Sequence, residues 1–490
     1  MADSQGFDCD RRCSRDMVPA VRSLPWREYC VATAASLVAA LVAALVLIHQ
    51  PIALVGVVVG IPVLYMTLRS PRFAFCLWFA SLCFIPYWLI VHVGVSWPPG
   101  SILGLLVLPS ALTHRPRRGI TTGDWIALAF ACACTSAYLF GGAPRSLLAQ
   151  VFVQGGIAYL VGRNLAPAAG RQWTINTISI VLTIIGVWAI GEYIFSLHPF
   201  TRLDLGSPQG YWAALQTRGG HVRSEAAFGQ AISLGAALAV GVPFVYMSTF
   251  RNSRKALAWA ILGCGLLTTA SRGPLVAAAL GFVLVIVFGE GRVVRGTRLV
   301  FSYLGLLIAV PVAYLLTARL NEAGTEVASS ANYRGTLYRL ALEDMHVNSL
   351  ADNVRFTEAG HQIYHEALGS IDSTFLQTAL VFGWLPVAII LGGFAIIIAR
   401  ILVRKANVSE IALVAQLPVL ATVALITQYY YMVWFMAGFA VALTVEKHAV
   451  FVSSHAVPES SIPVLERRDV IQGLGRPTYT RLPDEVQQGF

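Results

Sequence analysis

Charged residues are scarce in this chain. Only 12% of its 490 residues are Asp, Glu, Lys or Arg, whereas 56% are hydrophobic. A water-soluble globular protein of this size does not need so much apolar residue. Apolar runs of about 17 to 25 residues recur along the sequence, and each is long enough to cross a bilayer as a helix. The runs lack the polar–apolar alternation of a membrane β-barrel, so they predict an all-α, polytopic membrane protein.

The sequence also lacks the marks of several other classes. None of the eight cysteines lies in the two long polar loops, which excludes a disulfide framework. The net charge of +10 comes mostly from basic residues that flank the apolar runs, as topology signals do. No basic, aromatic-rich segment indicates a nucleic-acid partner. The first apolar run is too long for a cleaved signal peptide, so we expect an uncleaved anchor.

We expect about 12 to 14 transmembrane helices, and the sequence offers fourteen candidate spans. They lie near 28–50, 51–68, 73–94, 99–113, 123–140, 146–162, 173–196, 226–249, 255–271, 274–290, 298–317, 372–400, 408–426 and 428–446. With the amino terminus inside, every expected cytoplasmic link carries two or more Arg or Lys. These links are 69–72, 114–119, 162–171, 250–255, 289–298 and 400–406.

This topology divides the chain into tails, helices and loops. Residues 1–27 form a cytoplasmic tail, and the polar residues 447–490 form a second one that we expect to be disordered. Transmembrane helices fill 28–196, 226–317 and 372–446. Two long outer loops cover 197–225 and 318–371. No internal repeat or inverted transporter-like repeat is evident.

The outer loops break the positive-inside rule. Their arginines are Arg202, Arg218, Arg223, Arg319, Arg334, Arg339 and Arg355, and the topology adds Arg272. Arginine binds phosphate through a planar fork, so a cluster at the outer membrane surface suits the pyrophosphate head group of a lipid. The structural alternative is that the scattered arginines pair with loop carboxylates or face water.

Arg272 stands apart because it lies in a very short link, Ser271-Arg272-Gly273-Pro274, between two apolar runs. Pro274 fits the first turn of a helix, whose backbone N–H groups favour an anion. An ionisable residue at membrane depth is a functional candidate, although Arg272 as a snorkelling interface residue is the alternative. Arg223 is followed by Glu225, so a local ion pair is its structural interpretation.

The second outer loop contains two further patterns. Residues 332–345 predict an amphipathic helix that lies on the membrane surface or covers a cavity, with Arg334 on one side. His361 and His365 have the i, i+4 spacing of a metal pair, but a zinc protease needs Glu where Gln362 stands. Either histidine serves structurally in the loop, or one of them or Asp372 acts as a general base or orients an acceptor hydroxyl.

Taken in order, these features resemble the O-antigen ligase/polymerase superfamily, whose members are inverting membrane glycosyltransferases with a GT-C-like helical fold. The resemblance covers about residues 220–400. It rests on Arg223 with Phe228, the Ser271-Arg272-Gly273 turn, Arg334 in the loop helix, and the segment 371–386 entering the next span. The family often has His-Asn before an aromatic residue and Leu at the end of the loop, whereas this chain has Asp372 and Ser373 there.

The resemblance implies an enzyme on the outer face of the bacterial cytoplasmic membrane. The donor would be a glycan on undecaprenyl pyrophosphate, held by Arg272, Arg223 and Arg334. The acceptor would be a second glycan or a lipid-linked sugar, activated by Asp372, His365 or His361. The resemblance implies no metal and no cofactor, and it leaves room for partners in a polysaccharide-synthesis complex.

We expect a polysaccharide polymerase, and the alternative within this class is an O-antigen ligase that transfers to a lipid. A polysaccharide or lipid transporter, or flippase, is the rival from another class. Against it, the spans hold few midplane charges, with Glu192 the main exception. A structural partner in an envelope-synthesis complex is the third alternative.

Overall fold

The computed structural model describes ten segments of the chain: 51–93, 95–114, 119–201, 210–218, 221–289, 335–336, 338–339, 342–356, 363–366 and 369–455. The chain divides after Glu446 into two parts, and each is described by itself. The predicted spans 28–50 and 298–317 lie outside the described residues, as do the tail 1–27 and most of the tail 447–490.

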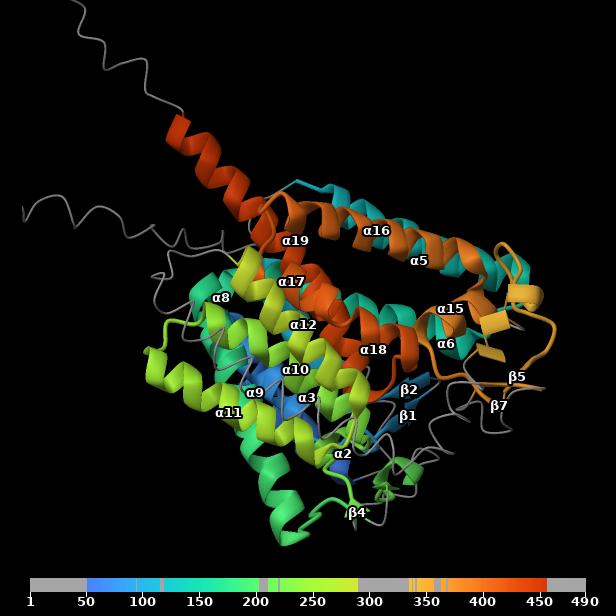
Figure 1. The fold of residues 1–490 in the computed structure, drawn as a ribbon, viewed down its shortest axis with the longest axis horizontal. Helices are drawn as coiled ribbons and strands as arrows, with labels where there is room; N and C mark the ends of the chain where they lie inside the picture. The colour runs from blue at the N-terminus through green and yellow to red at the C-terminus, as the bar shows by residue number, and fades with distance from the viewer. Residues whose placement is uncertain are drawn as a thin grey trace, which may run out of the picture. The chain divides into compact units, whose positions relative to one another are not determined.

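The described part is mostly helical (Figure 1). Its helices are α2 (Pro51–Arg69), α3 (Pro71–Phe84), α4 (Pro99–Thr113), α5 (Thr122–Gly141), α6 (Arg145–Gln150), α7 (Ile157–Leu160), α8 (Ala166–Ala169), α9 (Arg171–Phe195), α10 (Ala231–Met247), α11 (Asn252–Thr268), α12 (Arg272–Phe288), α15 (Thr374–Phe382), α16 (Trp384–Leu402), α17 (Val408–Ala415), α18 (Leu417–Thr422) and α19 (Thr427–His455). Two π-helical turns, η1 (Val151–Gly156) and η2 (Val161–Leu165), join α6, α7 and α8, and short 3₁₀ turns form η3 (Gly210–Ala213) and η4 (Ala226–Phe228).

Four described helices are long and apolar enough to cross a membrane: α5, α9, α16 and the Thr427–Glu446 part of α19. Shorter apolar helices accompany them at Pro71–Phe84, Pro99–Thr113, Ala231–Met247, Arg272–Phe288 and Val408–Thr422. These are the features of an all-α membrane protein. The total of 12 to 14 spans stays a prediction.

Short antiparallel strands lie in the links between some of the helices. They are β1 (Val91–Val93) with β2 (Val95–Trp97), β3 (Thr217–Arg218) with β4 (His221–Val222), and the three-stranded sheet β5 (Val354–Phe356), β6 (Ile363–His365) and β7 (Gly369–Ser370) in that order. The first pair shortens the predicted span 73–94, because α3 ends at Phe84 and the chain then turns into β1.

The predicted span 372–400 is wrong as one helix. Gly383 has φ +89° and separates α15 from α16. A Cβ atom at Gly383 would lie 2.5 Å from the carbonyl oxygen of Val347, because the preceding loop packs against the break. That loop accepts hydrogen bonds from the next helix, as in Trp384 N–H to the His346 carbonyl at 3.0 Å. The long-range contact with the loop therefore fixes the break.

Two other predicted spans also differ. The span 408–426 ends at Thr422 and is divided at Gln416, just before Pro418, into α17 and α18. The span 226–249 begins as the separate turn η4, and α10 starts only at Ala231.

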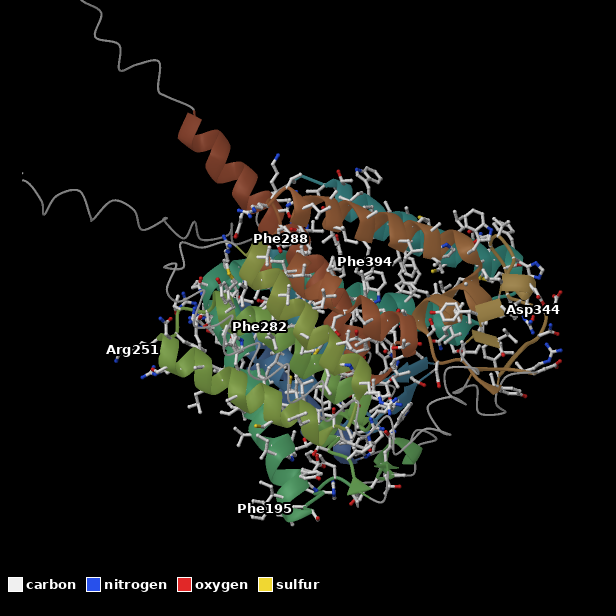
Figure 2. All side chains as sticks on the ribbon, in the orientation of Figure 1. Phe195, Arg251, Phe282, Phe288, Asp344 and Phe394 are labelled. Atoms are coloured by element: carbon white, nitrogen blue, oxygen red, sulfur yellow. The ribbon has the colours of Figure 1, made fainter. Side chains whose placement is uncertain are left out.

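Helix α10 is the centre of the core. It packs against α9, α11, α12 and α17 (Figure 1), and nearly all of its residues are buried. Small residues permit close helix approach: a Cβ at Gly235 would lie 2.9 Å from Pro274 Cβ, at the start of α12. Phe282 of α12 packs edge-on against Trp259 of α11, with ring centroids 5.0 Å apart (Figure 2).

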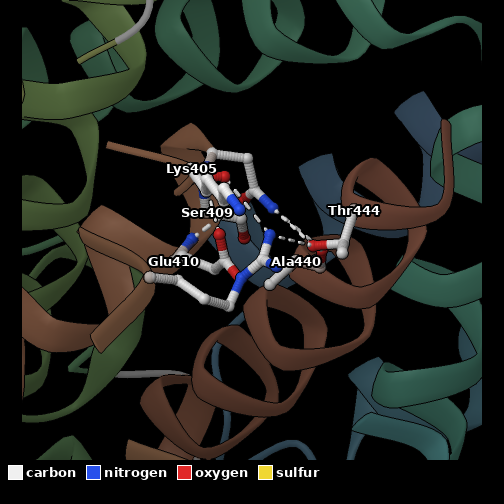
Figure 3. A network of polar contacts seen from close by, with 7 residues as sticks. Lys405, Ser409, Glu410, Ala440 and Thr444 are labelled. Carbon is white, nitrogen blue, oxygen red and sulfur yellow. Dashed lines mark hydrogen bonds and ion pairs between the residues drawn. The ribbon is translucent and has the colours of Figure 1, made fainter. Parts of the chain in front are cut away.

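A buried polar network fastens α16, α17 and α19 at the link predicted to be cytoplasmic (Figure 3). Arg400 Nε donates to Glu410 Oε1 at 2.6 Å, and its Nη2 donates to Thr444 Oγ1 at 3.1 Å. Asn407 caps α17 and donates to the Ala440 carbonyl at 2.9 Å. Because each partner is satisfied, the network holds the end of α16 and the start of α17 against α19 in one arrangement.

Candidate functional site

The turn between α11 and α12 is strained and short. Helix α11 ends at Thr268, and Ala270 adopts φ +47°, a left-handed conformation that costs a non-glycine residue about 1 kcal/mol or more. Ser271 is the N-cap of α12, and Arg272 is its first residue. The predicted Ser-Arg-Gly turn therefore places Arg272 at a helix start, where the macrodipole favours negative charge.

Arg223 is fastened to this turn. Its side chain is 8% exposed. Nε donates to the Thr269 carbonyl at 2.8 Å, and Nη2 donates to Ser271 Oγ at 2.5 Å. A third bond joins Nη1 to Gln216 Oε1 at 3.3 Å. Arg223 and Arg272 are 49 positions apart in sequence, but both lie at this turn, because Arg223 binds Ser271, the residue that precedes Arg272.

The segment that carries Arg223 is held by backbone bonds on both sides. The N–H of Arg223 donates to the Gln216 carbonyl at 3.0 Å, and the N–H of Ser224 donates to the Thr268 carbonyl at 3.2 Å. The Oε1 atom of Glu225 accepts the N–H of Gln216 at 2.8 Å. Burial, with a contribution from the charge of Glu192, raises the pKa of Glu225 to about 7.

A second carboxylate, that of Glu192, binds the backbone of this segment. Glu192, near the end of α9, is 3% exposed, and its Oε2 accepts the N–H of Glu225 at 3.0 Å and of Ala226 at 2.8 Å. Its Oε1 lies 2.7 Å from Nδ1 of His198. Glu192 therefore fixes the bend that η4 makes after Arg223, where Ala226 has φ +47°.

The second outer loop contacts the site at the end of α18. A Cβ at Gly273 would lie 3.5 Å from Thr422 Oγ1, so the start of α12 adjoins the end of α18. Both N and Oγ1 of Thr374 donate to the Val423 carbonyl, at 3.0 and 2.8 Å. Residues 421–423 thus lie between the Arg272 turn and the segment that contains Asp372.

The predicted loop helix also reaches this point. Its described residues 335–336, 338–339 and 342–344 are helical. The hydroxyl of Tyr338 donates to the Ala421 carbonyl at 2.7 Å and lies 3.4 Å from Ser373 Oγ. Arg334 lies one turn before Tyr338 in sequence, outside the described residues.

The remaining predicted residues are distributed as follows. Asp372 is exposed and directly precedes Ser373, the N-cap of α15. His365 ends β6 and pairs with Val354 and Gly369, so the i, i+4 helical spacing with His361 does not apply to it. His361 lies outside the described residues. Among the described residues, no three His, Cys, Asp or Glu side chains gather as a metal site.

Sequence reasoning missed the pair of Glu192 and His198 as members of the site. The signal for Glu192 was present, because a carboxylate within an apolar run is expensive unless it is paired. His198 gave no signal, because its contact depends on how the chain turns back after α9. Ser196, which begins that turn, has φ +51°.

Backbone strain is concentrated here. Of the five described non-glycine residues with positive φ, Ala226, Ala270 and Thr427 adjoin the site. Gln428, next to Thr427, donates from Nε2 to the Ala227 carbonyl at 2.7 Å. Strained residues persist where the surrounding structure fixes them, and they often mark functional sites.

No protein-family model, curated protein or solved structure matches the chain.

Proposed function

We propose that this protein is an inverting glycosyltransferase of the membrane, which transfers a glycan from undecaprenyl pyrophosphate to an acceptor hydroxyl. The proposal places the site on the outer face of the bacterial cytoplasmic membrane and the helices in a GT-C-like arrangement. It rests on the resemblance in the sequence and on one structural observation: the bond of Arg223 to Ser271, beside Arg272.

The chemistry required is the stabilisation of a departing diphosphate. Arg272, at the start of α12, combines a guanidinium with the positive end of a helix dipole, and both favour an anion. Arg223 has protein acceptors for three of its N–H groups, so its proposed role includes holding the turn in the shape that presents Arg272. Arg334, from the loop helix, would complete the diphosphate site.

The second loop would supply the acceptor side. Tyr338 and Thr374 both bond to carbonyl groups at the end of α18, next to the start of α12. An acceptor held by this loop would therefore approach the donor near Arg272. Asp372, His365 and His361 are the candidates from the loop for orienting or deprotonating the acceptor.

A polysaccharide polymerase is favoured over an O-antigen ligase because the loop ends in Asp372-Ser373 rather than the ligase-like His-Asn. The two activities differ only in the acceptor, which is a growing glycan in one and a lipid-linked sugar in the other.

The test uses purified protein, a lipid-pyrophosphate glycan and either acceptor. We expect longer glycan, or glycan-modified lipid, together with free lipid pyrophosphate. Arg272→Lys should lower the transfer rate by about 100-fold while the protein remains folded, because lysine keeps the charge but loses the bidentate fork. Wild-type turnover in this variant would refute the role of Arg272, and movement of unchanged lipid across a vesicle would indicate a transporter instead.

A further inference from the structure

Glu192 and His198 form a buried carboxylate–imidazole pair beside the Arg223 segment. His198 Nδ1 lies 2.7 Å from Glu192 Oε1, and the two side chains are 9% and 3% exposed. The other carboxylate oxygen accepts two backbone N–H groups, from Glu225 and Ala226. Because both oxygens of Glu192 are engaged, the carboxylate fixes the orientation of the imidazole ring.

The His198 side chain is much less exposed than those of the residues just before it. Its neighbours Phe195 and Leu197 are 68% and 66% exposed, and Phe195 lies at the end of α9 (Figure 2). The chain turns at Ser196, with φ +51°, and brings the imidazole back to Glu192. A strained backbone and a buried polar ring together indicate that the contact is held in place by the surrounding structure.

The second ring nitrogen of His198 makes no hydrogen bond to the described residues. Nε2 is buried and has no hydrogen-bond partner among the described residues. When Nδ1 carries its proton toward the carboxylate, Nε2 is left as a lone-pair acceptor. Buried acceptors are nearly always satisfied, and no described residue supplies the donor here, so a hydroxyl group of a ligand can take this place.

We propose that His198 Nε2 accepts the proton of the acceptor hydroxyl during glycan transfer, with Glu192 as the residue that positions the ring and the loop residues left to orient the acceptor. This step rests on the proposed function. The acceptor oxygen forms a bond to the anomeric carbon while its O–H bond breaks, and the proton goes to Nε2. The anomeric C–O bond breaks at the same carbon, and its electron pair leaves with the lipid pyrophosphate. The Glu192 carboxylate stabilises the imidazolium that forms.

The charged groups around the pair fit this role. Glu192 belongs to α9, and Glu225 and Arg223 belong to the segment packed on it. Arg223 connects that segment to the Arg272 turn through Ser271. One continuous set of hydrogen bonds therefore links the proposed base to the proposed diphosphate site.

The test compares the wild type with His198→Ala in the full-length protein, using a lipid-pyrophosphate glycan and its acceptor between pH 5 and 9. His198→Ala should reduce the rate by about 100-fold or more, change the shape of the pH–rate profile and regain part of its activity when imidazole is added. Binding of the donor should change little, whereas His198→Ala should lower the melting temperature because Glu192 loses a buried partner. His346→Ala, at a loop histidine that is 45% exposed, is the control.

The outcomes separate the two proposals. An active wild type with an unchanged rate and pH profile in His198→Ala refutes the role of His198 alone. A loss of rate that imidazole does not restore, together with a lower melting temperature in both His198→Ala and His198→Gln, shows a structural role and also overturns the step. A wild type that releases no lipid pyrophosphate refutes the proposed function, and the step with it.

Discussion

Arg223→Lys tests whether the Arg223 fork holds the turn that carries Arg272. The arginine donates to Thr269, Ser271 and Gln216, and its side chain is 8% exposed. A hydrogen bond from a charged group contributes about 1.5 kcal/mol or more. Lysine presents one ammonium at the end of a flexible stem, so we expect it to keep one of the three bonds.

The loss of two bonds amounts to about 3 kcal/mol, or about a 100-fold fall in rate if the turn is displaced from its working position. The protein would be purified in detergent, and both the thermal unfolding midpoint and the release of lipid pyrophosphate would be measured. Arg251→Lys is the matched control, because Arg251 is exposed at the opposite end of α11 and makes no side-chain cap bond (Figure 2).

We expect Arg223→Lys to lose both stability and activity and Arg251→Lys to lose neither. If Arg223→Lys unfolds at the wild-type midpoint and transfers glycan at the wild-type rate, the bonds to Thr269 and Ser271 do not hold the turn, and the reasoning is refuted.

Two further predictions follow from charge and backbone geometry. The raised pKa of Glu225, about 7 in the folded protein, means that the folded state binds a proton more tightly than the unfolded chain, so this residue's contribution to stability decreases as pH rises from about 4.5 to 7. Glu225→Gln should remove this pH dependence, so its thermal midpoint should rise relative to that of the wild type between pH 5 and pH 8. If the midpoints of the two proteins change in parallel with pH, the raised pKa of Glu225 is contradicted. Gly383→Ala should destabilise the protein by about 2 kcal/mol or more, because φ is +89° and the new Cβ would lie 2.5 Å from the Val347 carbonyl. Gly392→Ala, inside α16 and with no atom within 4 Å of its Cβ position, should be close to neutral in the same melting experiment. Equal midpoints for the two variants would argue against the break at Gly383.

The apolar runs predicted much of the helical architecture because membrane spans are a local property of composition. Helix α5 begins at Thr122 and α9 at Arg171, each within two residues of the predicted start. The turn at Arg272 was also predicted, since Ser271 and Pro274 are local helix-start signals. Local signals of this kind need no knowledge of the rest of the fold.

The features that the sequence did not reveal depend on distant contacts. The break at Gly383 requires the loop at Val347 to pack against it. Two of the side-chain hydrogen bonds of Arg223 go to a turn 46 and 48 positions away, which the nearby Glu225 gave no reason to expect. Glu225 accepts the N–H of Gln216, and the charge of Arg223 favours its ionised form. The pair of Glu192 and His198 likewise forms only when the chain folds back after α9.

The unequal lengths of the helices have a consequence for the surrounding lipid. Helix α9 has 25 residues, whereas α12 has 17 and α3 has 14. Straight helices of 17 and 14 residues measure about 25 Å and 21 Å, less than the roughly 30 Å of a bilayer's hydrocarbon. Where such a helix spans the bilayer, the acyl chains beside it compress or tilt to match its length, which draws head groups and water inward. Under the proposed function, the polyprenyl chain of the donor would meet the protein in such a thinned region, with its polar end below the level of the neighbouring phospholipids.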